Sequence, residues 1–312
     1  MDMWSTTRLI SVIFLAVLLE GGLVSCTAKN SPATVQPTIP ISSNTPSPTP
    51  TETPLPPSPT PIPLAATVNG EAISLDEYEA QLAQFISAQG ELSTVDESEA
   101  RTTVLNDLID QSLLAQAAHR EGFMVDDESL QLRVENLVEQ VTGEQSLQDW
   151  IQTQGYNQES FESALRRSIE AAWMRDQIIS EVPSTAEQVH ARQILVYDIG
   201  EANQVLRELQ SGKDFATLTA LYDPQTLGDL GWFPRGYLVD PNLDEAAFSL
   251  QTEEYSGIIE TRVGFHILQV IERDPERLLD PDARLVWQEK ALQEWIETQR
   301  SQSEIVILDI ET

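Results

Sequence analysis

The sequence is poor in the residues that hold metals, form disulfides or bind phosphate. It has one cysteine and three histidines in 312 residues, and His119, His190 and His266 lie far apart in the chain. This excludes a zinc site and a disulfide framework. Only 18 lysines and arginines stand against 50 aspartates and glutamates, a net charge of −32. Such a balance argues against nucleic-acid binding, which needs cations on phosphate, and against an electrostatic anchor on anionic lipid.

Long apolar runs are also lacking, apart from one near the start. Residues 9–19 follow Arg8 and are too few to span a membrane comfortably. The run leads to Leu23-Val24-Ser25-Cys26, which resembles a bacterial lipoprotein signal, in which the cysteine is acylated and becomes the mature N-terminus. The resemblance implies that residues 1–25 are removed and that a lipid on Cys26 holds an extracytoplasmic protein at the cell membrane. An uncleaved anchor helix is the alternative, and it places the rest of the chain on the same side.

The next segment is rich in proline. Residues 27–65 contain 12 of the 18 prolines, mixed with serine and threonine. Such a composition cannot bury a core and favours an extended chain. At about 3.1 Å per residue its maximum reach is on the order of 100 Å. We therefore predict that residues 26–65 comprise the lipidated cysteine and a tether.

From residue 66 the pattern predicts a helical domain that ends near residue 188. Asn69-Gly70 is typical of a tight hairpin turn, and Ser74 with Glu77 is typical of a capping box that opens a helix. Apolar residues at helical spacing predict four further helices: 97–121, one from residue 126 or 127, a short one around 147–151, and 158–181.

This helical domain has a net charge of −18, from 24 acidic and 6 basic residues between 66 and 188. Two interpretations remain open. The acidic side chains are either the solvated faces of helices around a core, or a rim around an apolar groove that receives unfolded chains. The apolar stripes do not separate the two, because a core and a groove need the same helix face.

Over residues 189–273 the spacing of the apolar residues changes, and the new pattern predicts a small α+β domain with an antiparallel sheet. We expect a strand at 191–197, helices at 201–210 and from 214, and a glycine-rich stretch at 228–236. A short helix at 243–248 and strands near 258–260 and 264–270 complete the order β-α-α-β-α-β-β.

Several blocks in this segment resemble a parvulin-type peptidyl-prolyl isomerase domain. They are Ala191–Val196, Asp214-Phe215, Gly228–Gly236, Ala246–Leu250 and Gly264–Val270. The preceding segment resembles the N-terminal domain of SurA- and PrsA-like extracytoplasmic foldases. The resemblance implies a membrane-anchored foldase that isomerises X-Pro bonds in unfolded or exported polypeptides, with no cofactor and no metal.

The implied reaction needs little chemistry. Rotation about a peptide bond crosses a barrier of about 18–20 kcal/mol, which is mostly lost amide resonance. A catalyst therefore needs an apolar cup for the proline ring and polar groups that favour the twisted amide. The resemblance assigns the cup to Leu230, Leu238 and Leu243, and Phe248 joins them as a substrate-binding residue.

The resemblance also implies two histidines and a Cys or Asp beneath the cup. His266 matches the second histidine, and its strand parity groups it with Leu268 and Val270 on the apolar side. The first histidine falls on Gln193, which forms hydrogen bonds but does not titrate. The acidic position falls on Asp223, with Pro224 as the direct alternative.

Gln193 leaves two functions open. One is an enzyme of weak to moderate isomerase activity. The alternative is a catalytically weak or inactive holdase chaperone that uses the parvulin-like domain only to bind peptides. His190 is not a substitute for the missing histidine, because its strand parity is opposite.

The pattern of apolar residues over 274–312 predicts a helix at 282–300 and a strand at 305–308. A two-stranded hairpin around Asn69-Gly70 would be marginal alone. We therefore expect residues 305–309 to pair with the strand near 65–73, and the helix to pack on the N-terminal helices. The fold class is then α+β, with a parvulin-like domain inserted into a helical SurA-like domain that a C-terminal helix and strand close.

Overall fold

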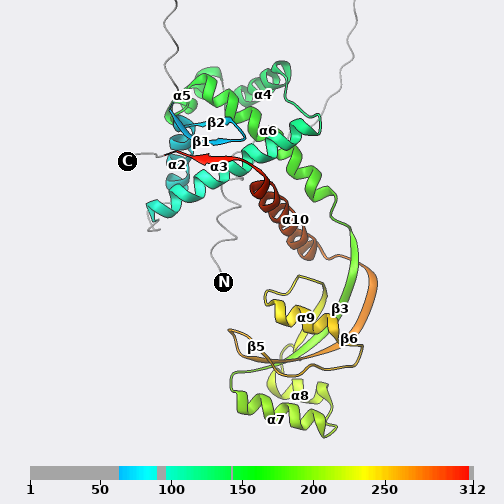
Figure 1. The fold of residues 1–312 in the computed structure, drawn as a ribbon. Coiled ribbons are helices and arrows are strands. Elements are labelled where there is room, and N and C mark those ends of the chain that lie inside the picture. Colours follow the sequence, from blue (N-terminus) through cyan, green and yellow to red (C-terminus); the bar gives the residue numbers. More distant parts are fainter. Residues whose placement is uncertain (1–62, 90–95, 142, 309–312) are drawn as a thin grey trace, which may run out of the picture.

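The computed structural model describes residues 63–89, 96–141 and 143–308. The predicted signal peptide, Cys26 and nearly all of the predicted tether lie outside these ranges. Within them, no helix combines the length and the apolar character needed to cross a membrane. Figure 1 shows a helical part and a smaller part built on a sheet, which strands β3 (Thr185–Val196) and β6 (Phe265–Leu278) connect.

The helical part contains the five predicted helices in the expected order. They follow a hairpin of β1 (Leu64–Val68) and β2 (Glu71–Ser74), whose turn holds Asn69 and Gly70 at φ of 53° and 83°. Positive φ at both turn residues is what an Asn-Gly hairpin provides. The helices are α2 (Leu75–Gln89), α3 (Glu97–Arg120), α4 (Asp127–Gln140), α5 (Glu144–Thr153) and α6 (Gln158–Ser180).

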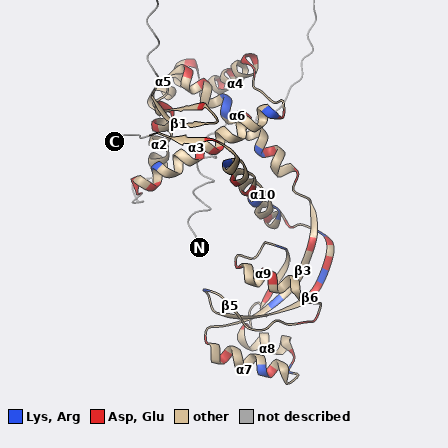
Figure 2. Cartoon of the chain, viewed as in Figure 1, with Lys and Arg blue, Asp and Glu red and all other residues tan. Residues whose placement is uncertain are grey.

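Aspartate begins many of the helices in both parts. In each case its side chain accepts a backbone N–H of the first turn, as it does at Asp96, Asp126, Asp198, Asp214, Asp240 and Asp280. Such a cap contributes about 1 kcal/mol to stability. Hydrogen bonds from Ser129 and Thr217 hold the pKa of Asp126 and Asp214 below its ordinary value. Some of the acidic excess, which Figure 2 shows on helices of both parts, therefore serves local structure.

Only half of the capping box predicted at Ser74 forms. Ser74 Oγ accepts the Glu77 N–H at 3.3 Å. The Glu77 carboxylate is 4% exposed and pairs instead with the buried Arg167 of α6. The prediction for the Glu77 side chain was wrong, because an arginine buried between helices needs a carboxylate beside it.

The C-terminal segment returns to the helical part, as predicted. Strand β7 (Ile305–Ile307) pairs antiparallel with β1, so that the sheet has the order β2-β1-β7. Helix α10 (Pro281–Gln302) packs against α6 and α3 through Leu292 and Trp295. Its Arg300 forms hydrogen bonds with Asp110 and Asn106 of α3. The sheet domain is therefore an insertion between two parts of one helical module.

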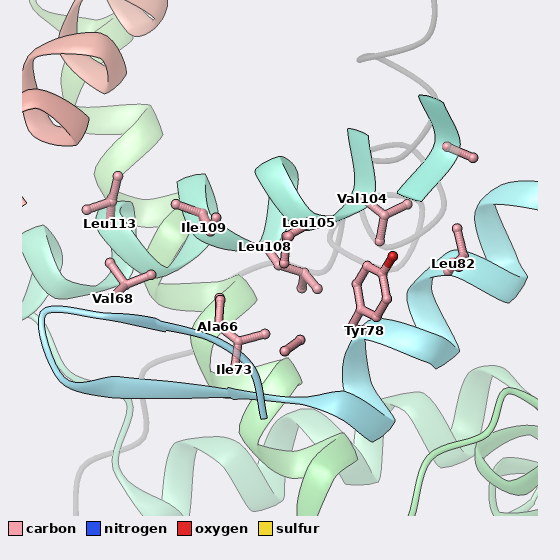
Figure 3. Close-up of a cluster of buried hydrophobic side chains, with 12 residues drawn as sticks. Ala66, Val68, Ile73, Tyr78, Leu82, Val104, Leu105, Leu108, Ile109 and Leu113 are labelled. Carbon is pink, nitrogen blue, oxygen red and sulfur yellow. The ribbon is translucent and has the colours of Figure 1, made fainter. Parts of the chain in front are cut away.

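The main core of the helical part lies between the hairpin and α3 (Figure 3). Apolar side chains of the hairpin and of α2 face a stripe at helical spacing on α3, and the set includes Val68, Ile73, Tyr78, Leu108, Ile109 and Leu113. This packing and the third strand together stabilise a hairpin that would be marginal alone.

The inserted sheet domain has the predicted order β-α-α-β-α-β-β. Its four strands are antiparallel in the order β4-β3-β6-β5, with β4 at Asp229–Pro234 and β5 at Ile259–Glu260. Its helices are α7 (Ile199–Gln210), α8 (Phe215–Tyr222) and α9 (Pro241–Ser249). The predicted domain boundaries at 188/189 and 273/274 fall within the paired strands β3 and β6, and they stay predictions.

Candidate functional site

The two faces of the inserted sheet carry two separate apolar clusters. Ile194 and Val196 of β3 pack with α7 and α8 on one face. Val189 and Ala191 of the same strand pack with α9 and β4 on the other. Alternation along β3 therefore places Gln193 on the face of the second cluster. Because this second cluster includes Leu230, Leu238 and Leu243 of the predicted cup, we call this face the cup face.

His266 lies on the cup face, as its strand parity predicted. It is opposite Leu195 in the register of β3 and β6, and it is 5% exposed. Its Nδ1 lies 2.8 Å from Gln193 Oε1, and its Nε2 lies 2.9 Å from Thr261 Oγ1. An amide oxygen only accepts hydrogen bonds, so Nδ1 donates to it. Nε2 faces the Thr261 hydroxyl, which also lies 3.3 Å from Gly264 O, and in a neutral ring Nε2 is an acceptor. This pattern belongs to a neutral imidazole with its proton on Nδ1.

The electrostatics of the site agree with a neutral ring. Burial lowers the pKa of His266 below its ordinary value, and the carboxylate of Asp240 opposes that shift. Asp240 begins α9, where its side chain accepts the Asn242 N–H at 2.9 Å. A lowered pKa keeps His266 uncharged at pH 7, where it holds neighbouring groups in place and supplies no charge.

The four predicted substrate-binding residues gather in one cluster beside His266. Leu230, Leu238 and Leu243 are half-buried and pack against the buried side chains of the cup face. Phe248 is buried, and its ring packs edge-to-face with Phe233 at 6.1 Å between centroids. Phe248 is thus part of the cup's support, while the three leucines keep surface that a ligand can cover.

The glycine-rich stretch approaches the backbone of Gln193 closely. Gln193 donates its backbone N–H to Gly228 O at 2.8 Å. Gly228 has φ of 67°, and a β-carbon there would clash with the carbonyl oxygen of Gln193. Only glycine fits this position, which brings the start of β4 next to the middle of β3.

Asp223 is held by its own loop. Its carboxylate accepts the backbone N–H groups of Gln225 and Thr226 and the Thr226 hydroxyl. These hydrogen bonds lower its pKa. No contact described for Asp223 reaches His266 or Gln193. The structure thus brings His266 and Gln193 together, while it places Asp223 in the turn that leads to Gly228.

His190 lies outside the cluster, in agreement with its parity. Its Nε2 is 2.8 Å from Asp229 Oδ1, and its ring stacks on Trp232 of β4.

The loop that carries Leu238 is held from two sides. Asp244 Oδ1 accepts the Gly236 N–H at 2.8 Å from within the domain. From outside, Trp287 of α10 donates its Nε1–H to Arg235 O at 3.1 Å. Helix α10 therefore connects the helical part to the loop of the cup.

Two residues of the site were missed by the sequence reasoning, Thr261 and Asp240. Thr261 has a usable signal, because Gly264 lies between it and His266 and a short antiparallel turn brings such residues together. Asp240 has none in a single sequence, since its approach depends on how α9 packs.

The fold and the site together define a PPIase-type domain inserted into a helical chaperone-type domain, and comparisons with known proteins agree. The family model for the SurA-like N-terminal domain matches residues 54–175, and that for the PPIC-type PPIase domain matches residues 185–272. Two family models thus match consecutive parts of the chain, which is similar to proteins named foldase PrsA and chaperone SurA.

Individual relatives show how much of the chain is shared. The foldase protein PrsA of Caldanaerobacter subterraneus subsp. tengcongensis is 29% identical over 234 residues, which cover 66% of this chain and 72% of that protein. The chaperone SurA of Legionella pneumophila is 33% identical over 144 residues, which cover 39% of this chain and 33% of SurA. A crystal structure of PrsA from Bacillus cereus covers 77% of this chain and 88% of its own, at 18% identity and a TM-score of 0.42.

Proposed function

We propose that this protein is a membrane-anchored, extracytoplasmic peptidyl-prolyl cis-trans isomerase that assists the folding of exported proteins. The observation that carries the proposal is the hydrogen-bonded chain Gln193–His266–Thr261 beside three half-buried leucines. The reaction needs a cup for the proline ring and a fixed polar group at the amide, and the leucines and the Gln193–His266 pair on one sheet face support this assignment.

Each residue has a role that follows from its contacts. Leu230, Leu238 and Leu243 receive the proline ring. Both nitrogens of His266 are occupied, so the ring positions its neighbours and does not itself transfer a proton. Gln193 Oε1 is held by His266, and no described contact occupies its Nε2. Nε2 is therefore the donor that stabilises the carbonyl oxygen as the X-Pro amide twists.

This role makes glutamine a sufficient partner for His266. Isomerisation breaks no covalent bond and moves no proton, so a neutral donor that is better aligned with the twisted amide than with the planar one lowers the barrier. A single such hydrogen bond contributes about 1–2 kcal/mol, or roughly a tenfold change in rate. We accordingly propose a weak to moderate activity.

The test is cis-trans exchange of an X-Pro peptide, measured by exchange NMR with the full chain and without a coupled protease. Leu243→Ala should lower the exchange rate about tenfold, because one wall of the cup is lost. The matched control is Leu285→Ala, which truncates an exposed leucine of α10 and should leave the rate unchanged. Wild-type protein that accelerates no peptide at high concentration would refute catalysis.

Suppression of client aggregation by that same inactive protein would favour the alternative, a holdase that only binds peptides. The acidic helical domain is the part that we propose holds clients, so raising the salt concentration should change client capture more than isomerisation. Equal salt sensitivity of both activities would contradict this division.

The membrane anchor is a separate part of the proposal and depends on residues 1–26. Cys26→Ala should move the protein from the membrane fraction to the soluble extracytoplasmic fraction after cell fractionation, because the acylation site is lost. Unchanged membrane association would instead favour the uncleaved anchor helix.

A further inference from the structure

Three apolar residues lie beyond His266, where the paired strands β3 and β6 end at the β5–β6 turn. They are Leu195 and Tyr197 of β3 and its continuation, and Val263 of the β5–β6 turn. Tyr197 is 77% exposed and Val263 is 64% exposed. We call these three residues the apolar rim. None of them belongs to a hydrophobic cluster of the described core, so packing of the fold does not account for them.

The alternation of β3 places the rim on the same face as the site. Ile194 and Val196 point to the helix-covered face. Gln193, Leu195 and Tyr197 therefore project to the cup face. Leu195 is opposite His266 in the register with β6, so the rim begins directly beside the buried histidine.

The turn between β5 and β6 lies against two rim residues and carries the third. A β-carbon on Gly264 would lie 3.0 Å from Leu195 Cδ1 and 3.4 Å from Tyr197 Cδ1, so both side chains lie against this glycine. Val263, the preceding residue, donates its N–H to Thr261 Oγ1 at 3.1 Å. This hydrogen bond links the rim to the same hydroxyl that contacts His266.

The order of groups along the cup face determines which residue of a bound peptide contacts the apolar rim. The leucine cup packs with Val189, Ala191, Leu268 and Val270, on one side of Gln193. The rim begins at Leu195, on the other side. When a proline ring occupies the cup and its amide lies at Gln193, the residue that precedes the proline falls on the rim.

We propose that the apolar rim is a subsite that selects an apolar or aromatic residue before the proline. The inference rests on the proposed function, since it assumes that the cup receives proline. The chemistry of the partner follows from the rim's carbon surface, which a leucine or phenylalanine side chain covers with mutual loss of exposed apolar area. An acidic side chain gains nothing from this carbon surface, because covering the rim would remove water from its charge.

The positive charge of Arg262 favours the opposite preference, for an acidic residue before the proline. It is exposed on the same turn as Val263, and a cation there attracts an acidic side chain. The experiment therefore includes an acidic peptide and the variant Arg262→Gln.

The test compares peptides Ala-Xaa-Pro-Ala, with Xaa as Phe, Leu, Ala or Glu, by exchange NMR with the full chain. Phe and Leu peptides should exchange about tenfold faster than the Ala peptide at equal concentration, and the Glu peptide no faster than Ala. Tyr197→Ser and Val263→Ser should each reduce the Phe-over-Ala ratio about threefold or more. Leu221→Ser removes an equally exposed side chain on α8 and should leave the ratio unchanged.

The outcomes separate this inference from the proposed catalysis. If no peptide exchanges faster with the protein, catalysis is refuted. The rim is then tested by binding of the same Xaa peptides, measured from the chemical shifts of the Val263 methyl groups. Equal exchange and equal binding for all four peptides would overturn the subsite. A preference for Glu that Arg262→Gln abolishes would also overturn it, in favour of an anionic subsite.

Discussion

Gln193 offers the sharpest test of the site, because its side-chain amide is in direct contact with Nδ1 of a buried histidine. The informative change is Gln193→Glu, which keeps the size of the side chain and puts a carboxylate at the end now 2.8 Å from His266 Nδ1. The measured quantity is the pKa of His266, from the pH dependence of its ring resonances by NMR.

The expected shift follows from the contacts. In the wild type, burial lowers the His266 pKa below its ordinary value of about 6.5. A carboxylate in direct contact stabilises the imidazolium and typically raises such a pKa by 1–3 units. A shift of about 2 units corresponds to about 2.7 kcal/mol of differential stabilisation. At pH 7 the ring should be neutral in the wild type, and the pKa of His266 should be clearly higher in the variant.

The wild-type shift also sets the pH dependence of stability. The unfolded chain binds a proton at His266 at a higher pH than the folded chain does. The contribution of His266 to the free energy of unfolding is therefore complete above about pH 6.5, and it decreases as the pH falls towards the lower, folded-state pKa. Urea unfolding at pH 7.5 and pH 5.5 should show lower stability at pH 5.5. The Asp caps at Asp126 and Asp214, whose pKa values are lowered, add loss at still lower pH.

Two further variants complete the series. Gln193→Leu leaves the buried Nδ1–H without an acceptor, which should cost about 1–2 kcal/mol and reduce peptide exchange about tenfold. Gln210→Glu adds the same charge at an exposed position of α7 and should leave the pKa of His266 unchanged. A wild-type pKa at or above the ordinary value, or an unchanged pKa in Gln193→Glu, would refute the reasoning.

Three other substitutions and one control test how the site and the helical part are held in place. Gly228→Ala should destabilise the sheet domain by at least about 2 kcal/mol, measured by urea unfolding, because its β-carbon would clash with strand β3 at positive φ. Trp287→Phe removes the hydrogen bond from α10 to the cup loop and should reduce peptide exchange about two- to threefold. Trp295→Phe on the same helix packs elsewhere and should leave the exchange rate unchanged. Arg300→Ala should lower the stability of the helical part by about 1–3 kcal/mol in thermal unfolding while peptide exchange persists.

Most of the fold could be predicted because its signals are local. The aspartate caps, the Asn69-Gly70 turn and the 3.6-residue spacing of apolar side chains each act within one or two turns of chain. The return of β7 to β1 is a long-range feature. It was predicted because a lone hairpin is marginal and needs another strand.

The site could be predicted in part. Strand parity predicted that His266 faces the apolar side, and the family resemblance placed Gln193 at the position of its partner, where the structure brings the two side chains together. Parity says nothing about turns and helix ends, where Thr261 and Asp240 approach the ring. It also did not show that Asp223 would bond to its own loop, because short polar side chains in turns bond first to the nearest backbone N–H groups.

The sequence by itself determined the two-part organisation, the order of the elements and the residue types available to the site. Only the tertiary structure decided which groups meet: Glu77 with a buried arginine, Thr261 with His266, Trp287 with the cup loop, and the rim with the cup face. The physical reason is the distance along the chain over which each effect acts. Propensity, capping and alternation act over a few residues of chain, whereas these contacts join segments that only the packing of separate elements brings within hydrogen-bond or van der Waals distance.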